Sequence, residues 1–258
     1  MNRSVDYSQV AGEYDRRYVE ILFDGLERAL LDFIGRDAGA RVLEVGCGTG
    51  HWLALLQGRG LAVAGLDASA GMLERARARA PGAVLKQGHA DRIPWEDGSF
   101  DRLLCVNAFH HFDDKDGFIA EARRVLRAAG GLMIIGLDPH AGLDRWCIYD
   151  YFEGTLDIDR RRYLPTARVE ELMRAAGFSE CRTSEAHRVV MWPPARAAIE
   201  KSLLAKTTIS QLGVLTDAEY RQGIDRINAA IEASEAKGEV LVLDIDLRLY
   251  ATAGWRRG

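Results

Sequence analysis

Cysteine is scarce in this chain, and the pattern of its four residues excludes a disulfide scaffold. Cys47, Cys105, Cys147 and Cys181 are far apart, and no two of them form a Cys-x-x-Cys pair. The first two lie in apolar runs, where a free thiol behaves as a small hydrophobic side chain. We therefore expect reduced cysteines and a cytoplasmic location.

Long apolar runs and massed charge are also missing. No segment approaches the roughly 20 apolar residues that a membrane span needs, and no apolar core follows the start at residues 1–6, as it would in a secretory signal. The net charge is −4, and Arg75, Arg77 and Arg79 alternate with other residues as on a solvated helix face. We expect no membrane insertion and no nucleic-acid partner.

The most informative segment that is present runs from Val42 to Gly50. An apolar run ends in three glycines at alternate positions, with Glu44 two residues before the first. This predicts a buried strand that turns sharply and leaves its backbone bare where a ligand approaches. A dinucleotide turn, Gly-x-Gly-x-x-Gly, needs glycine at the sixth position, which here is His51. A carboxylate beside the turn suits a cationic ligand better than a pyrophosphate.

Strand-length apolar runs alternate with segments of helical period. The strands are expected at 41–45, 62–67, 83–87, 100–107, 131–137, 180–192 and 240–250, and the helices at 51–58, 70–80, 116–127 and 168–176. Four of these strands, at 41–45, 62–67, 100–107 and 131–137, barely alternate and are apolar on both faces, which is typical of a parallel sheet covered by helices on each side. The last strand, at 240–250, alternates apolar and acidic residues, as an edge strand does. The pattern predicts an α/β fold with a doubly wound, mostly parallel, seven-stranded sheet.

Four segments that follow predicted strands resemble one family. Glu44-Val45-Gly46-Cys47-Gly48-Thr49-Gly50 resembles motif I of the class I S-adenosylmethionine-dependent methyltransferases, an acidic residue followed by Gly-x-Gly-x-Gly. Asp67, the stretch 88–101 and the stretch 107–112 are similar to the family pattern that follows, and the resemblance covers residues 38–138. It implies a Rossmann-like fold of the small-molecule, type 11-like branch. It also implies S-adenosylmethionine as cofactor, S-adenosylhomocysteine as product and a small-molecule acceptor.

The resemblance also assigns residues to the cofactor. It implies that the glycine turn holds the methionine part with Glu44 near the ammonium group, that Asp67 accepts from the ribose hydroxyls, and that Asp91 takes the adenine amino group. The expected cofactor-binding residues are Glu44, Gly46, Cys47, Gly48, Gly50, Asp67, Ala68, Met72, Ala90, Asp91, Asn107, Ala108 and Tyr14.

Two adjacent histidines, His110 and His111, are the candidate catalytic residues. In an extended chain their side chains point in opposite directions, and the other histidines are scattered, so we expect no metal site. Either ring is a candidate general base because histidine titrates near neutrality. A hydrogen-bonded or stacking role is the alternative.

The remaining segments are expected to form a cover within a single domain, residues 1–258. The cover comprises a helical segment at 1–35 and two insertions, 140–164 and 193–238, that form an acceptor lid around the core at 38–138. Thr216 and Glu219 predict a capped helix start in the second insertion. Apolar pockets suit small acceptors, and the candidate pocket residues are Tyr18, Trp146, Tyr149 and Phe152.

Two other function classes stay open. One is a methyltransferase that acts on RNA or protein, although the chain has no evident basic face. The other is a non-catalytic nucleotide-binding relative, although no ligand residue of the family pattern is lost.

Overall fold

The computed structural model describes residues 23–35 and 39–257 of the chain. Tyr14, Tyr18 and most of the expected cover at 1–35 lie outside these residues. The strands are β1 (Arg41–Val45), β2 (Ala62–Asp67), β3 (Val84–Gln87), β4 (Phe100–Val106), β5 (Leu126–Gly136), β6 (Arg145–Trp146), β7 (Phe178–Met191) and β8 (Ile245–Arg256). The helices are α3 (Asp24–Ile34), α4 (His51–Gly58), α5 (Ala70–Arg79), the 3-10 turn η1 (Phe109–His111), α6 (Lys115–Val125), α7 (Cys147–Tyr151), α8 (Thr155–Arg162), α9 (Thr166–Ala175), α10 (Ala195–Glu200), α11 (Ser210–Gly213) and α12 (Asp217–Glu235).

One sheet organises the molecule. Its order is β3-β2-β1-β4-β5-β8, and β7 pairs with the other edge of β8. Strands β1 to β5 pair in parallel, whereas β8 runs antiparallel to both β5 and β7. This confirms the predicted doubly wound, mostly parallel α/β class. The sheet has one strand more than predicted, because the two-residue β6 pairs with the start of β8.

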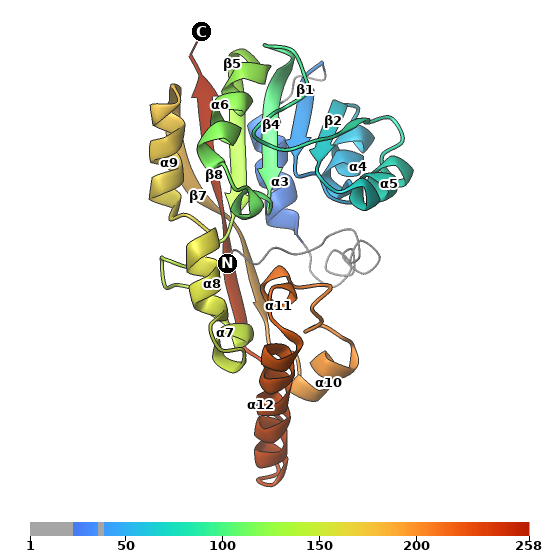
Figure 1. Ribbon diagram of the computed structural model, residues 1–258, viewed down its shortest axis with the longest axis vertical. Helices are drawn as coiled ribbons and strands as arrows, with labels where there is room; N and C mark the ends of the chain where they lie inside the picture. The colour runs from blue at the N-terminus through green and yellow to red at the C-terminus, as the bar shows by residue number, and fades with distance from the viewer. Residues whose placement is uncertain (1–22, 36–38, 258) are drawn as a thin grey trace.

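Helices cover both faces of the sheet, which explains the unbroken apolar strands. Val42 and Leu104 belong to one buried cluster that includes Leu30 of α3 and Trp52 of α4. The next residue of β1, Leu43, belongs to the opposite cluster, which includes Phe118 of α6 and Met173 of α9. Figure 1 shows α6 and α9 in front of the sheet and α3 behind it. A parallel sheet enclosed in this way buries successive residues on alternate faces.

The last strand differs from its prediction. It spans Ile245–Arg256 and is flanked by β5 and β7, so β7 is the edge strand. One of the acidic residues that suggested an exposed edge, Asp246, is paired across the sheet: both of its oxygens accept bonds of 2.7 Å from Arg188 of β7. At this position the acidic residue reflects cross-strand ion pairing rather than exposure to solvent.

The lower halves of β7 and β8 run beyond the end of β5 as a ribbon, which the short β6 joins at the start of β8. Val189 pairs with Leu247 and Met191 with Ile245 in this ribbon. The two insertions, residues 140–164 and 193–238, pack together below the sheet (Figure 1), and we call them the insertion module. They share a third buried cluster, which includes Ile148, Phe152, Leu212, Ile227 and Ile231. The predicted capping box of Thr216 and Glu219 is confirmed at the start of α12.

Candidate functional site

The glycine turn after β1 has a backbone that only glycine adopts readily. Gly46, Gly48 and Gly50 have φ angles of 74°, 51° and 76°, in the left-handed region. The amides of Gly46 and Cys47 both donate to the Leu66 carbonyl at 2.8 and 3.1 Å, which holds the turn against the end of β2. A Cβ on Gly46 would lie 2.4 Å from the Cβ of Ala108. The turn therefore brings bare backbone to the carboxyl edge of the sheet, where the parallel strands end.

Asp67 is fixed at the end of β2 by two backbone donors. Its Oδ2 accepts from the Gly48 amide at 2.8 Å and its Oδ1 from the Ser69 amide at 2.9 Å. Burial raises the pKa of this carboxyl, and the backbone bonds from Ser69 and Gly48 act in the opposite direction. These bonds couple the position of the carboxylate to the glycine turn.

Glu44 lies deeper, on β1 behind the turn. Its side chain is 1% exposed, and Oε2 has no hydrogen-bond partner within the described part of the chain. Burial raises the pKa of this carboxyl well above its ordinary value, and the nearby charge of Asp67 raises it further. A buried carboxylate without a partner is costly, and a cation placed at the turn would relieve that cost.

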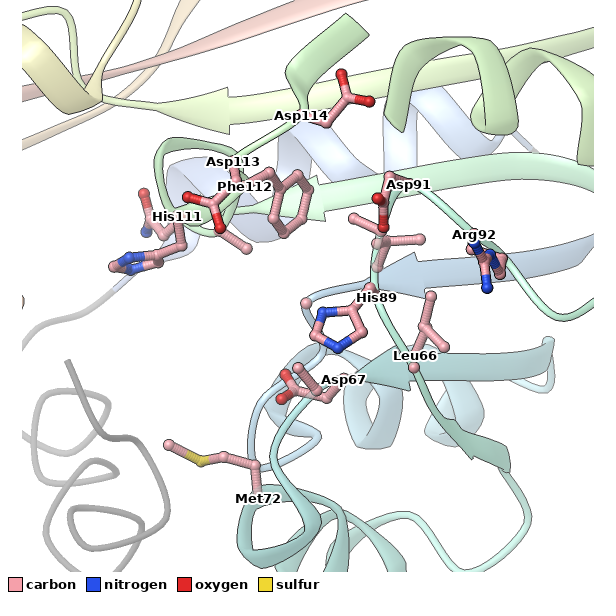
Figure 2. Close-up of a pocket in the computed structure, with 17 residues that line it drawn as sticks. Leu66, Asp67, Met72, His89, Asp91, Arg92, His111, Phe112, Asp113 and Asp114 are labelled. Carbon is pink, nitrogen blue, oxygen red and sulfur yellow. The ribbon is translucent and has the colours of Figure 1, made fainter. Parts of the chain in front are cut away.

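A cavity of about 480 Å³ opens at this carboxyl edge (Figure 2). Its lining includes these expected cofactor residues: Gly46, Asp67, Ala68, Met72, Ala90, Asp91, Asn107 and Ala108. Cys47, Gly48 and Gly50 build the turn behind it, and the Cys47 side chain is in the core at 5% exposure. Four carboxylates, those of Asp67, Asp91, Asp113 and Asp114, line the cavity with one arginine, Arg92. The first cavity therefore suits a positively charged ligand.

A second cavity of about 220 Å³ adjoins the first, and Asn107 and His111 line both. Asn107 follows β4 with a left-handed φ of 51°, and its amide donates to the Ile135 carbonyl at 2.8 Å. The β7–β8 ribbon supplies apolar side chains to the second cavity, namely Val189, Met191, Ile245, Leu247 and Leu249. Polar groups come from His110, His111, Tyr163, Ser210 and Gln211.

Only one of the described candidate acceptor residues, Trp146, lines the second cavity. Tyr149 and Phe152 lie outside its lining, contrary to the expectation. The Tyr149 hydroxyl donates to Asp159 at 2.9 Å. Phe152 is 1% exposed and stacks on Tyr220 within the core of the insertion module. Both rings therefore stabilise the module from inside.

The histidine pair does not adopt the extended geometry assumed from sequence. His110 and His111 lie in the 3-10 turn η1, and their ring centroids are 3.9 Å apart. His110 is 7% exposed, stacks on Tyr163 and has Nε2 3.1 Å from the tyrosine hydroxyl. His111 has Nδ1 3.2 Å from Nη2 of Arg162. Within residues 23–35 and 39–257, no group of three or more His, Cys, Asp or Glu side chains is arranged to hold a metal ion.

Comparisons with known proteins place the chain in a family. Residues 43–135 match the family model described as "Methyltransferase domain". A demethylmenaquinone methyltransferase of Thermotoga maritima is 32% identical over 159 residues, which cover 54% of this chain and 69% of that protein. The chain belongs to the class I S-adenosylmethionine-dependent methyltransferases.

Other relatives match this methyltransferase over a shorter part of their length. A demethylmenaquinone methyltransferase of Beutenbergia cavernae is 34% identical over 139 residues, so the match spans 50% of this chain and 58% of that protein. A solved structure of phosphoethanolamine N-methyltransferase 2 from Haemonchus contortus in complex with S-adenosyl-L-methionine has a TM-score of 0.64 at 16% identity. It covers 97% of this chain and 57% of that one. At that identity the likeness shows the fold alone.

The cofactor of this methyltransferase is S-adenosylmethionine, and the residues at the carboxyl edge fit its charges. The Glu44 carboxylate, whose Oε2 has no hydrogen-bond partner among the described residues, and the acidic first cavity suit a molecule that carries an ammonium and a sulfonium. Gly46 is also required for the packing of the turn, because a Cβ there would lie 2.4 Å from the Cβ of Ala108. In the described residues, no helix of the methyltransferase combines the length and apolar character of a bilayer span.

Several lining residues were missed by the sequence reasoning. His89 and Arg92 line the first cavity, and each is next to an expected residue. Tyr163 and Gln211 line the second cavity, but they are 48 residues apart in the chain and meet only through packing, with Gln211 Nε2 3.5 Å from the Tyr163 hydroxyl. No local pattern could have identified that pair.

Proposed function

We propose that this chain transfers the methyl group of S-adenosylmethionine to a small, mostly apolar acceptor held in the second cavity. The observation that carries the proposal is the junction at Asn107 and His111, where the acidic first cavity meets the apolar second one. When bound, the cofactor supplies an electrophilic methyl group on a sulfonium, which is already a good leaving group.

The chain's own task is then to hold two reactants on one line and to exclude water. Asp67 and Asp91 would hold the adenosyl part, and Glu44 would lie behind the ammonium group. The ribbon side chains would seat the acceptor beside the junction, and such orientation removes much of the barrier of a bimolecular reaction. The insertion module would act as the lid that keeps water from the reacting atoms.

A small-molecule acceptor is supported by two further observations. The second cavity, at about 220 Å³, is lined mainly by apolar side chains, as small-molecule sites are. The relative from Beutenbergia cavernae is named a demethylmenaquinone methyltransferase, and this name favours a small-molecule acceptor over RNA or protein. The four free cysteines are all buried, which supports the proposed cytoplasmic location.

Thermal unfolding with three ligands tests the proposal. S-adenosylmethionine and S-adenosylhomocysteine should each raise the melting temperature by mass action, and NAD should not. A shift with NAD alone would overturn the assignment. Radiolabelled methyl transfer to a metabolite extract, compared with transfer to tRNA and to protein, separates the acceptor classes. Label found only in macromolecules would contradict a small-molecule acceptor.

An Asp67→Ala variant refines this test. It should lose the shift with S-adenosylhomocysteine, because a carboxylate that accepts from the ribose is removed. Asp67 also accepts from Gly48 and Ser69, so the ligand-free melting temperature should fall as well. Asp157→Ala is the matched control, because Asp157 is an exposed residue of α8 outside both cavity linings. An Asp67→Ala protein that keeps the full ligand shift would refute the ribose role.

A further inference from the structure

The segment 88–99, between β3 and β4, carries one wall of the first cavity. Residues 88–92 line that cavity, and Figure 2 shows the side chains of His89, Asp91 and Arg92 along this part of the chain. None of the described residues 88–99 belongs to a helix or strand, so no ladder of backbone hydrogen bonds fixes them. Side chains from other elements must therefore set the position of Asp91 relative to the cavity.

Arg124 of α6 holds this segment through its guanidinium. Nη2 donates to the Ile93 carbonyl and Nη1 to the Trp95 carbonyl, each at 2.8 Å. Nη1 also donates to the carboxylate of Asp97 at 2.8 Å. Nε and Nη2 donate to the carboxylate of Glu121 at 2.7 and 2.8 Å. These bonds use all five N–H donors of the guanidinium, so its orientation relative to the segment is fixed.

Glu121, which precedes Arg124 by three residues in α6, binds the same segment. Its Oε2 accepts from the Ile93 amide at 2.8 Å, so side chains of α6 bind both the amide and the carbonyl of Ile93. The hydrogen bonds from Arg124 hold the pKa of the Glu121 carboxyl below its ordinary value. The two side chains therefore attach the segment to α6 as one charged unit.

Lys86 of β3 provides a further attachment. Its Nζ donates to the Pro94 carbonyl at 2.5 Å and lies 4.5 Å from the centroid of the Trp95 ring. The carbonyls of residues 93–95 therefore all accept from cationic side chains, two of them from Arg124 and one from Lys86. Three successive residues of an irregular segment are thus fixed to two elements of the sheet domain.

We propose that Arg124, together with Glu121 and Lys86, positions the carboxylate of Asp91 for the base of the cofactor, and that this attachment determines the selectivity of the first cavity for a 6-aminopurine. Asp91 lies two residues before Ile93, so a shift of the attached segment moves its carboxylate. The inference rests on the proposed function, in which Asp91 holds the adenosyl part. Arg124 is outside the lining of the first cavity, so it is a positioning residue that acts through Asp91.

The test compares S-adenosylhomocysteine with its 6-deamino analogue, in which hydrogen replaces the amino group of the base. By isothermal titration calorimetry, the wild type should bind the analogue about tenfold more weakly, because one hydrogen bond to a carboxylate is lost. Arg124→Met should bind S-adenosylhomocysteine about tenfold more weakly than the wild type does and the analogue equally well, so the ratio of the two affinities falls to about one. A ratio that stays near ten in Arg124→Met overturns the proposal.

A second variant keeps the proposal testable if Arg124→Met does not fold. Lys86→Met removes the donor to the Pro94 carbonyl and leaves the bonds from α6 in place. It should lower the ratio of the two affinities in the same direction, because the segment is then attached through α6 alone. If Arg124→Met does not fold and Lys86→Met keeps the ratio of the wild type, the attachment does not determine the selectivity and the proposal is wrong.

Arg174→Met is the matched control for a loss of stability. Arg174 of α9 pairs with Glu170 of the same helix and donates to the Cys181 carbonyl at 2.8 Å, so it joins a helix to another segment as Arg124 does. It is outside the lining of both cavities. Arg174→Met should lower the melting temperature and leave the ratio of the two affinities unchanged. Equal falls of that ratio in both arginine variants would contradict a specific role of Arg124.

Three further results separate this inference from the proposed function. If the wild type does not bind S-adenosylhomocysteine, the proposed function fails. If the wild type binds the two ligands equally, or if Asp91→Ala keeps the tenfold preference, Asp91 does not bind the amino group and the inference fails with that assignment. If Asp91→Ala loses the preference while Arg124→Met keeps it, the positioning role of Arg124 alone is wrong.

Discussion

Glu44 is a carboxylic acid whose burial makes its charge expensive. Because its pKa is raised by burial and by Asp67, the free energy of unfolding that this group contributes is present below its ordinary pKa and is lost as the pH rises. Glu44→Gln should therefore be more stable than the wild type at alkaline pH, with the difference closing toward pH 4 in denaturant titrations. S-adenosylhomocysteine should bind the variant about tenfold more weakly, because the carboxylate that we propose lies behind its ammonium group is gone.

The exposed Glu96 supplies the control, because Glu96→Gln removes one negative charge outside the site. If the free energy of unfolding of Glu44→Gln and that of Glu96→Gln depend on pH in the same way, the charged form of Glu44 does not destabilise the folded protein. If both bind S-adenosylhomocysteine like the wild type, Glu44 does not contact the cofactor.

Gly46 and Gly142 form a matched pair that separates backbone strain from crowding. Both have a left-handed φ, 74° and 65°, but a Cβ on Gly142 has no neighbour within 4 Å. Gly142→Ala should cost about 1 kcal/mol from backbone strain alone. Gly46→Ala should cost more and should abolish cofactor binding, because its Cβ would overlap that of Ala108. If urea titrations give the two variants equal losses in the free energy of unfolding, the turn can shift away from Ala108.

At the scale of elements, Gly223 of α12 packs closely against Phe152 after α7, and we expect this contact to stabilise the insertion module. A Cβ on Gly223 of α12 would lie 2.1 Å from a ring carbon of Phe152, just after α7. Gly223→Ala should destabilise the protein by about 1–3 kcal/mol through overpacking. Gly58→Ala at the end of α4, where nothing lies within 4 Å, should be neutral or slightly stabilising. Hydrogen exchange should locate the loss in α7 and α12; a loss spread over β1 to β5 would contradict a separate module core.

The elements also show what sequence could predict and what it could not. Strands β1, β2 and β4 were predicted to within one residue because both faces are apolar and their ends carry glycine or a polar residue. Asp67 ends β2 and Asp91 lies four residues after β3, so their place at the carboxyl edge was foreseeable, whereas Asp113 and Asp114 lie beyond η1 and were not predicted. The second cavity was not, because Tyr163, Gln211 and the ribbon come from distant segments. Phe152 was wrongly expected there, because an aromatic in an insertion serves a module core equally well.

For the whole molecule, burial of acids predicts a definite pH dependence. The pKa of Asp159 rises from an ordinary 3.8 to about 6, mainly through burial. Asp159 therefore contributes about 3 kcal/mol to the free energy of unfolding below pH 3.8, and this contribution is lost as the pH rises through 6. Asp159→Asn should thus gain stability relative to the wild type between pH 4 and pH 7 in urea titrations. A constant difference across that range would contradict a buried charge.

Asp246 should change stability with pH in the opposite direction, and it serves as the comparison. Its pKa is lowered to about 2, chiefly by its hydrogen bonds from Arg188. Its contribution is present above the ordinary value of 3.8 and is lost as the pH falls through 2. Asp246→Asn should therefore be most destabilising near neutral pH and should approach the wild type in strong acid.

The ribbon of β7 and β8 has a consequence for how new substrates are acquired. Its backbone ladder continues from the sheet beside β5 into the apolar wall of the second cavity, with one register shift between Glu185 and His187. Replacement of Met191 or Leu247 with bulkier or smaller side chains would reshape that wall, while the backbone hydrogen bonds that set the strand register stay the same. On the proposed function, acceptor specificity in this architecture can thus change one cavity-facing position at a time.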